Sequence, residues 1–506
     1  MGSNPHSTCL PGTRLKYIQK IYDLLLLDTN KQRIVWLNGP AGVGKSTIAL
    51  TIAERFARLS RLGAYIFFTQ NQSQPGQLIQ TIVDKLAFFD ASIAEHVKNI
   101  QSSCMDLTLE YQFEHLLLEP LKKAADRFEG PVIIILDALD ECGDATSRVD
   151  LLKLLSSGEF SKLPQNIRIL ITSRPEKDIV EAVGFQKNCI HTIDISPLDK
   201  SGREDVTLYL RYELNRIIDS DKEKDPADIS CLGHNIDKVI SSANGLFIWA
   251  STMVRLVKQD PRPTYKLGEI ARHIQPGRNH KFNLNKMYET ILSSSNIFDN
   301  YKETMCKMLS FILLYRKPIS GEGLKNLLGL RVDEIGLLSG LQSVLFYSRA
   351  EPIHFYHVSF SDYLTNKKRS GRYYVDVEAY RDTISDCCFS VMFRKGGLRV
   401  NICELPSPLV MYDNVPRLRD YISEELECAC TLWSCMRGRR SGDKRLSHKL
   451  EIFVREYLLL WLEAMSLTKN FRVVDQMLLK AIQWAEVRRI TFFDTKTNDQ
   501  QTKFVP

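Results

Sequence analysis

The sequence lacks several features that would assign it to a special class at once. It contains no apolar run that approaches the length of a membrane span, and its start has no secretory n-region and h-region. From residue 371 onward there is no internal repeat at the period of a solenoid or propeller, and no low-complexity tract. We therefore expect a globular, cytoplasmic protein that does not contact membranes.

Charge and cysteine usage are equally ordinary. The 67 basic and 60 acidic residues leave a net charge of +7, which neither demands nor excludes an anionic partner. The twelve cysteines are scattered, which favours reduced thiols over a disulfide framework. Cys428, Cys430, Cys435 and His448 do not match the spacing of paired C-x-x-C zinc knuckles, so a half-buried cysteine cluster is favoured over a metal site.

The most informative stretch runs from Arg33 to Leu59. Its apolar start, Ile34–Leu37, predicts a buried strand, and its second half has apolar residues at helical spacing. Between the two lies G-x-x-x-x-G-K-S, the P-loop motif in the strand–loop–helix context that it requires. Its residues are Gly39, Pro40, Ala41, Gly42, Val43, Gly44, Lys45 and Ser46, followed by Thr47. Backbone N–H groups and a helix N-terminus favour phosphate, so we expect a bound nucleoside triphosphate or diphosphate.

Within this loop, Lys45 is expected to pair the β and γ phosphate oxygens, and the Ser46 hydroxyl to ligate Mg²⁺. A second apolar run, Val132–Leu136, ends in Asp137. As the end of a buried strand, Asp137 would reach the same sheet edge and hold the Mg²⁺ shell, usually through water.

Two more acids follow, and a third strand ends in an arginine. Asp140 and Glu141 are placed to orient or deprotonate an attacking water, or simply to complement a helix dipole. The run Arg168–Ile171 leads into Thr172, Ser173 and Arg174. Arg174 can reach a γ-phosphate and stabilise its charge, with an ordinary surface arginine as the alternative.

Strand-like runs alternate with helical patterns through this half of the chain, which predicts a parallel sheet sandwiched by helices. The runs are Ile34–Leu37, Ala64–Phe68, Val132–Leu136, Arg168–Ile171 and Ile190–Ile195. After Pro197 helical patterns dominate, and two short strand candidates, Ser343–Ser348 and Ile353–Val358, follow helices as in a winged helix. Its recognition-helix candidate carries Glu and Gly rather than basic residues, which argues against nucleic-acid binding. The fold class is thus an α/β P-loop NTPase followed by mostly α-helical domains.

The segments GPAGVGKST, IIILDALDEC, ILITSRP and ISPL together resemble the NACHT family of STAND signalling NTPases. The later segments ANGLFIWASTMVRLV and IHFYHVSFSDYL resemble the helical and winged-helix modules of the fungal members. The resemblance implies a linker with a short helix at 1–30, a NACHT nucleotide-binding domain at 31–196, a helical domain at 197–262, a winged helix at 263–370 and a helical extension at 371–506.

The resemblance also implies residue roles. Lys45, Ser46 and Thr47 would bind phosphates and Mg²⁺, with Asp137 serving the metal and Asp140 and Glu141 serving hydrolysis. Arg174 would be the sensor arginine, and Pro197 would pack on the adenine. His357 would contact the ADP β-phosphate and lock the closed form. Thr13 and Arg14 would line the base.

The family resemblance implies a switch in which ADP holds the modules closed and exchange for ATP opens them for self-association. Family members usually carry an effector domain before the NACHT module and a repeat array after the helical extension. Only about thirty residues precede the P-loop strand here. We therefore expect a minimal or shortened chain, or separate effector and sensor partners. Two alternatives stay open: a turnover ATPase, and a scaffold that binds nucleotide without hydrolysis.

Overall fold

The computed structural model describes residues 7–26, 32–68, 75–98, 108–143, 148–185, 189–197, 199–222, 225–273, 280–294, 297–315, 319–406, 418–436 and 444–487. The chain forms two compact units, Met1–Met287 and Tyr288–Pro506. Each unit is described by itself. The five-part division expected from the sequence stays a prediction.

The first unit is built on a five-stranded sheet, and all of its strand pairs are parallel. The order across the sheet is β2-β3-β4-β1-β5. The strands are β1 (Ile34–Asn38), β2 (Leu62–Phe67), β3 (Val132–Asp137), β4 (Ile167–Ser173) and β5 (Ile190–Asp194). Each of the five apolar runs predicted as a strand is confirmed. β3 and β4 are buried along their whole length; β3 is apolar up to its last residue, Asp137, whereas β4 also buries Arg168, Thr172 and Ser173.

The strand order decides which residues meet at the edge where the strands end. β4 lies between β1 and β3, and their register is close to level, because Asn38 pairs with Ser173 and Leu136 pairs with Ile171. The P-loop after β1, the acids after β3 and Arg174 after β4 therefore emerge side by side. This is the edge at which parallel sheets bind their ligands.

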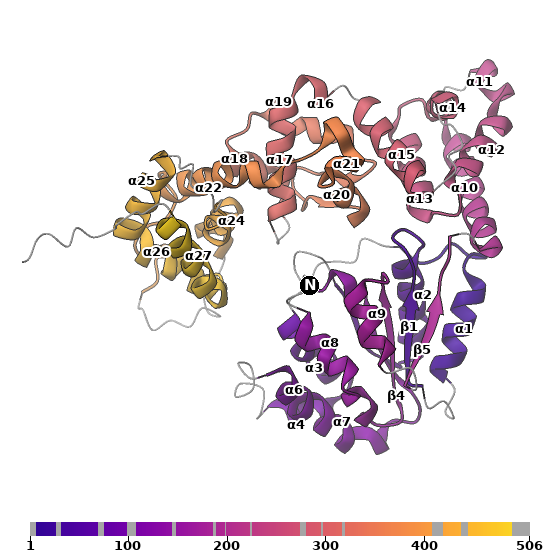
Figure 1. Cartoon of the computed structure of the whole chain (residues 1–506), viewed down its shortest axis with the longest axis horizontal. Coiled ribbons are helices and arrows are strands. Elements are labelled where there is room, and N and C mark those ends of the chain that lie inside the picture. The colour runs from indigo at the N-terminus through magenta and orange to yellow at the C-terminus, as the bar shows by residue number, and fades with distance from the viewer. Residues whose placement is uncertain are drawn as a thin grey trace, which may run out of the picture. The chain divides into compact units, whose positions relative to one another are not determined.

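Helices cover both faces of this sheet, as the strand–helix alternation predicted (Figure 1). On one side lie α1 (Leu15–Leu26) and α2 (Lys45–Arg58), which contact each other. On the other side lie α8 (Val149–Ser156) and α9 (Lys177–Gly184), which also contact each other. The buried residues of α1 recur at helical spacing, so its apolar stripe faces the interior.

The helices that follow the sheet complete the first unit. They are α10 (Lys200–Ser220), α11 (Pro226–Ser230), α12 (Leu232–Ala243), α13 (Phe247–Gln259), α14 (Pro263–His273) and the start of α15 (His280–Ser294). α13 begins directly against the P-loop, where the Ile248 N–H donates to the Gly42 carbonyl at 3.1 Å. The helical segment therefore forms part of the wall around the phosphate loop.

The second unit opens with helices and a two-stranded hairpin. The helices α17 (Lys302–Leu314), α18 (Gly321–Leu328) and α19 (Val332–Gly336) precede the antiparallel strands β6 (Leu345–Phe346) and β7 (His354–Phe355). This order is the one expected of a winged helix, an assignment that stays a prediction. The second strand is shorter than predicted: His357 is not on a strand but is the N-cap residue of α20 (Val358–Leu364). Its ring accepts the backbone N–H of Ser359, and such a side-chain cap favours the helix over a longer strand.

The end of the described chain packs around aromatic side chains. The helices there are α22 (Val377–Phe393), α24 (Glu424–Leu432), α25 (Lys444–Ile452), a π-helical turn at Phe453–Tyr457, α26 (Leu458–Leu467) and α27 (Val474–Val487). The indole of Trp433 lies 4.5 Å from the ring of Phe453 and 5.6 Å from Trp461, centroid to centroid. Within the described residues no cluster of three or more His, Cys, Asp or Glu is placed to hold a metal ion.

The contact between α13 and the P-loop gives a first prediction. Gly42 and Gly44 both have positive φ, 79° and 91°. A Cβ on Gly42 would lie 2.0 Å from Ile248 Cγ2, whereas one on Gly44 would meet its nearest neighbour at 3.8 Å. Gly42→Ala and Gly44→Ala should each lose about 1 kcal/mol of unfolding free energy to backbone strain. Only Gly42→Ala should lose a further 1–3 kcal/mol or so from overpacking.

Urea unfolding of the two nucleotide-free variants measures this difference. Equal losses would mean that α13 does not press on the loop at Gly42.

Candidate nucleotide-binding site

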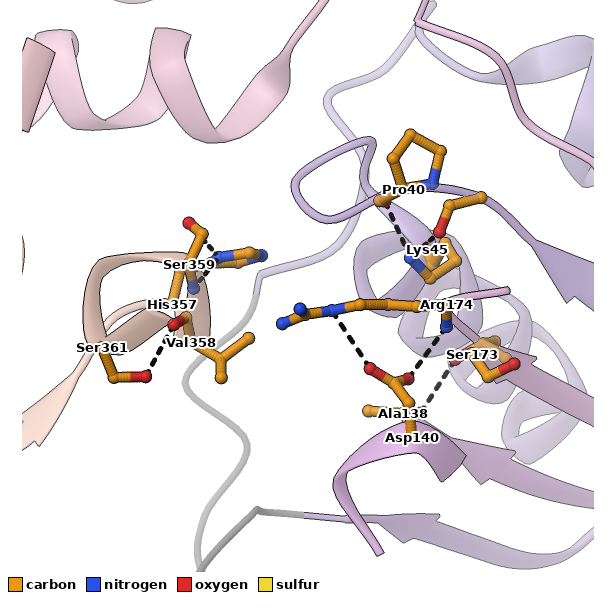
Figure 2. A network of polar contacts seen from close by, with 12 residues as sticks. Pro40, Lys45, Ala138, Asp140, Ser173, Arg174, His357, Val358, Ser359 and Ser361 are labelled. Atoms are coloured by element: carbon orange, nitrogen blue, oxygen red, sulfur yellow. Dashed lines mark hydrogen bonds and ion pairs between the residues drawn. The ribbon is translucent and has the colours of Figure 1, made fainter. Parts of the chain in front are cut away.

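The P-loop joins β1 to α2 and places Lys45 at the first helical position. The Lys45 ammonium donates to the carbonyl oxygens of Gly39 and Pro40, at 2.7 and 2.9 Å, so it is folded onto its own loop (Figure 2). Burial lowers the pKa of Lys45 to about 8, although the Asp140 carboxylate opposes this shift. The lysine is thus held at the loop with less than its ordinary preference for the charged form.

Two carbonyls of the loop are anchored from outside it. Ile248 N–H donates to the Gly42 oxygen, and Arg14 Nη2 donates to the Val43 oxygen at 2.7 Å. In a trans peptide the N–H of the next residue points opposite to the carbonyl. The N–H groups of Val43 and Gly44 are therefore turned away from these anchors, which is the arrangement that makes an anion-binding concavity.

Arg14 reaches this loop from the segment before α1. Its side chain is 2% exposed and its backbone is left-handed, with φ 59°. The guanidinium lies 3.8 Å from the Asp205 carboxylate and 4.8 Å above the ring of Phe247. Burial lowers the pKa of Arg14, and Asp205 opposes that shift. Thr13 is also buried, but its hydroxyl donates to the Leu10 carbonyl. Both residues stand beside the loop, and their contact with a base stays a prediction.

Asp137 ends β3 and is fully buried. Its Oδ1 accepts from the Thr172 hydroxyl at 2.5 Å and its Oδ2 accepts from the Tyr65 hydroxyl at 3.0 Å. Thr172 in turn accepts the Ala138 N–H at 2.9 Å. Thr172 thus orients both the Asp137 carboxylate and the turn that follows it. Tyr65, on the neighbouring strand β2, was not singled out from the sequence.

Asp140 and Arg174 form the most complete contact of the site. Asp140 Oδ1 accepts the Arg174 backbone N–H at 3.0 Å, and Oδ2 lies 3.1 Å from Arg174 Nε (Figure 2). The Asp140 side chain is 7% exposed and that of Arg174 20%. The two predicted residues are therefore brought together, with the acid fixing both the backbone and the head of the arginine. Glu141, the next residue, is half-buried.

Other predicted residues take simpler positions. Ser46 and Thr47 lie in the first turn of α2, where the Thr47 carbonyl accepts the Thr51 hydroxyl at 2.8 Å. Pro197 is buried, and its carbonyl fits so closely against Gly245 that a Cβ there would lie 2.2 Å away. In the second unit, His357 Nδ1 lies 2.7 Å from the Ser359 hydroxyl, which is itself 2.7 Å from the Tyr288 hydroxyl.

The side chains at the sheet edge fit a nucleotide with Mg²⁺. Gly39 has no room for a side chain, since a Cβ there would lie 2.7 Å from the Ile195 carbonyl oxygen, so the loop starts packed closely against the residue after β5. The ammonium of Lys45 can meet phosphate, while the Ser46 hydroxyl and the Asp137 carboxylate are the oxygen donors that Mg²⁺ prefers. Sequence analysis missed Ile248, Asp205 and Tyr65, because only the packing of distant segments brings them here.

The lowered pKa of Lys45 gives a second prediction. Because the protonated form binds phosphate, nucleotide binding should raise this pKa. Affinity should therefore be fully present below pH 8 or so and fall as pH rises. The Kd for ADP should increase about 30-fold between about pH 7 and about pH 9.5.

Calorimetric titration across this range is the measurement. Lys45→Ala should abolish binding at every pH, whereas Lys45→Arg, if it binds, should show a flat profile because its charge is permanent. A wild-type affinity that does not change with pH would contradict the assignment of Lys45 to phosphate.

Two comparisons of sequence agree with this site. The family model for the N-terminal region of nephrocystin 3 matches residues 18–174, a span that begins in α1 and ends at Arg174. The vegetative incompatibility protein HET-E-1 of Podospora anserina is 23% identical over 486 residues. That match covers 87% of this chain, and the chain spans about a third (34%) of the length of this curated relative.

Two solved structures resemble the chain at lower identity. A STAND protein with a tetratricopeptide repeat sensor from Pyrococcus horikoshii has a TM-score of 0.46 and 12% identity, covering 96% of this chain and 57% of its own. A Walker-type ATPase of Pyrococcus abyssi has a TM-score of 0.32 and 13% identity, covering 68% and 93%. Scores this low do not establish a shared fold.

Among the helices that the structure describes, none is both long and apolar enough to cross a membrane. The architecture at the sheet edge is that of a P-loop protein, with the phosphate loop after β1 and a buried acid after β3. The full P-loop, the acidic turn Asp137–Glu141 and the relatives in sequence agree on one assignment. The resemblance of this chain to the NACHT-type STAND P-loop NTPases of the fungal kind is thereby confirmed.

Proposed function

We propose that this protein is a nucleotide-controlled signalling switch. ADP holds the closed state, exchange for ATP permits self-association, and slow hydrolysis returns the switch to its starting state. One observation carries the proposal: the P-loop, Asp137, the acids Asp140 and Glu141, and Arg174 lie at one sheet edge, and Arg174 is bound by Asp140. The name of the relative HET-E-1 supports an output in vegetative incompatibility, with effector or sensor functions supplied by other domains or partners.

The residue roles follow from the contacts. Ser46 and Asp137 would hold Mg²⁺, which neutralises phosphate charge when bound. Asp140 already binds Arg174 through both carboxylate oxygens, so we assign the orientation of the attacking water to Glu141. Arg174 would report the third phosphate, because a γ-phosphate competes with Asp140 for the same guanidinium.

A turnover ATPase is the second candidate function, since Asp140 and Glu141 would serve hydrolysis in an ATPase as they would in a switch. The clamp between Asp140 and Arg174 favours the switch, because the arginine has to leave or share its partner before it can stabilise transferred charge. A scaffold that binds nucleotide without hydrolysis is the least favoured function, because it would not need Asp140, Glu141 or Arg174 at the sheet edge.

The first experiment identifies the nucleotide that the protein carries. Purified protein is denatured, the released nucleotide is identified by chromatography, and the native sample is sized in parallel. We expect near-stoichiometric ADP on a monomer and ATP turnover far below about 1 s⁻¹, the low end for ordinary enzymes. An empty site with brisk turnover would instead establish the ATPase, and an empty site without turnover would leave only the scaffold.

We further propose that His357 contacts the β-phosphate of ADP in the closed state. Its Nδ1 accepts the Ser359 N–H at 3.0 Å, so the neutral ring carries its proton on Nε2, which makes that nitrogen a donor suited to phosphate oxygen. His357→Ala should raise the Kd for ADP about 10- to 100-fold, the value of one hydrogen bond to a charged group, and increase self-association.

Calorimetry and sizing measure both effects. His354→Ala is the matched control, because His354 lies three residues earlier, on β7, and stacks on Phe346 instead. If His357→Ala and His354→Ala behave alike, the proposed lock does not exist in this protein.

A further inference from the structure

A buried arginine outside the predicted site holds the acidic turn in place. Arg148, immediately before α8, is 6% exposed and donates through Nη1 to the carbonyl oxygens of Asp140, at 2.7 Å, and Gly143, at 3.0 Å. Its Nε and Nη2 donate to Asp178 Oδ2 on α9, at 3.3 and 2.8 Å. One guanidinium thus connects two flanking helices to the turn that carries the hydrolytic acids.

The turn itself has few internal constraints. Its short 3₁₀ segment, Leu139–Glu141, begins after Ala138, whose φ of 62° is unusual for a residue with a side chain. Its internal backbone bonds run from Glu141 N–H to the Ala138 oxygen, from Cys142 N–H to the Leu139 oxygen and from Gly143 N–H to the Glu141 oxygen. The Asp140 and Gly143 oxygens are bound by Arg148. The conformation of the turn therefore depends on a contact from outside it.

Asp140 transmits this contact to the site. Its backbone oxygen is bound by Arg148 on one side, while its carboxylate holds Arg174 on the other. The chain of contacts runs from Asp178 through Arg148 and Asp140 to Arg174. A shift in the first link would move the arginine and the neighbouring Glu141 together.

We propose that Arg148, oriented by Asp178, is a positioning residue for nucleotide hydrolysis. It does not touch the nucleotide; it fixes the turn so that Glu141 meets the attacking water and Arg174 meets the γ-phosphate. The planar fork of an arginine suits this task, because it binds two carbonyls and a carboxylate at fixed angles, which a lysine cannot reproduce. This inference rests on the proposed hydrolysis.

Stability alone explains the pair less well. A buried ion pair often adds little net stability, since the desolvation of both charges offsets their attraction. Arg148 instead donates two hydrogen bonds to the backbone of the turn that carries Asp140 and Glu141. That choice of partners points to geometry at the site.

The test is a double-mutant cycle with Arg148→Lys and Glu141→Gln, read by ATP hydrolysis and ADP affinity. Arg148→Lys should slow hydrolysis about 10- to 100-fold, as a small misplacement of catalytic groups does. It should leave the Kd for ADP within about threefold of wild type. Because the lysine acts through Glu141, the double variant should be no slower than Glu141→Gln alone.

Two further variants complete the design. Asp178→Asn keeps the shape of the aspartate that binds Arg148 but removes its charge. It should slow hydrolysis too, by a smaller factor than Arg148→Lys. It replaces Arg148→Lys in the cycle if that variant does not fold. Lys153→Ala is the control: it lies on α8 too, but its pair with Asp150 is exposed, so hydrolysis should not change.

The outcomes separate this inference from the proposed function. Three outcomes would overturn the positioning role without affecting the proposed function. They are wild-type turnover in Arg148→Lys, a loss of ADP affinity in Arg148→Lys as large as its loss of hydrolysis, and slower hydrolysis in the double variant than in Glu141→Gln. Wild-type protein that binds ADP but never hydrolyses ATP would overturn the hydrolytic part of the proposed function, and the positioning role with it.

Discussion

The structure of the candidate site depends on one constraint: charges withdrawn from water must be paired or hydrogen-bonded. The sheet edge collects Lys45, Asp137, Asp140 and Arg174, which are partly or fully buried. Lys45 is held by loop carbonyls, Asp137 by two hydroxyls, and Asp140 and Arg174 by each other. Each pairing also fixes the orientation of a side chain, so the contacts that satisfy the buried charges also position these side chains around the proposed phosphate site.

The same constraint applies to two buried arginines that contact the site's loops from outside. Arg14 and Arg148 are both buried arginines, and each donates to backbone oxygens of a functional turn while facing an aspartate on a helix. Arg14 serves the P-loop and faces Asp205 on α10; Arg148 serves the acidic turn and faces Asp178 on α9. Loops that bind ligands have few contacts of their own, and these arginines connect them to rigid helices.

This arrangement suits a switch. Contacts from α13 and from the segment before α1 reach the phosphate loop within the first unit, so in the proposed switch the occupancy of the loop and the packing of these segments would affect each other. In the second unit, a cap contact fixes the tautomer of His357. A nucleotide that draws Arg174 away from Asp140 would change the balance of contacts at the sheet edge, which is the differential interaction that a ligand needs in order to shift two states.

The sequence by itself determined the five strands of the sheet, the phosphate loop and the residues that stand where the strands end. Local patterns are enough for these, because a buried parallel strand is mostly apolar and a phosphate loop needs glycine at fixed spacing. The P-loop, the acid at the end of β3 and Arg174 could therefore be predicted by number. Tertiary structure decided the partners: that β4 separates β1 from β3, that Asp140 binds Arg174, that Thr172 and Tyr65 orient Asp137, and that His357 caps a helix instead of ending a strand. Apart from the cap of His357, which is local, these contacts join residues from tens to more than a hundred positions apart, and no local pattern specifies which distant side chains packing will bring together.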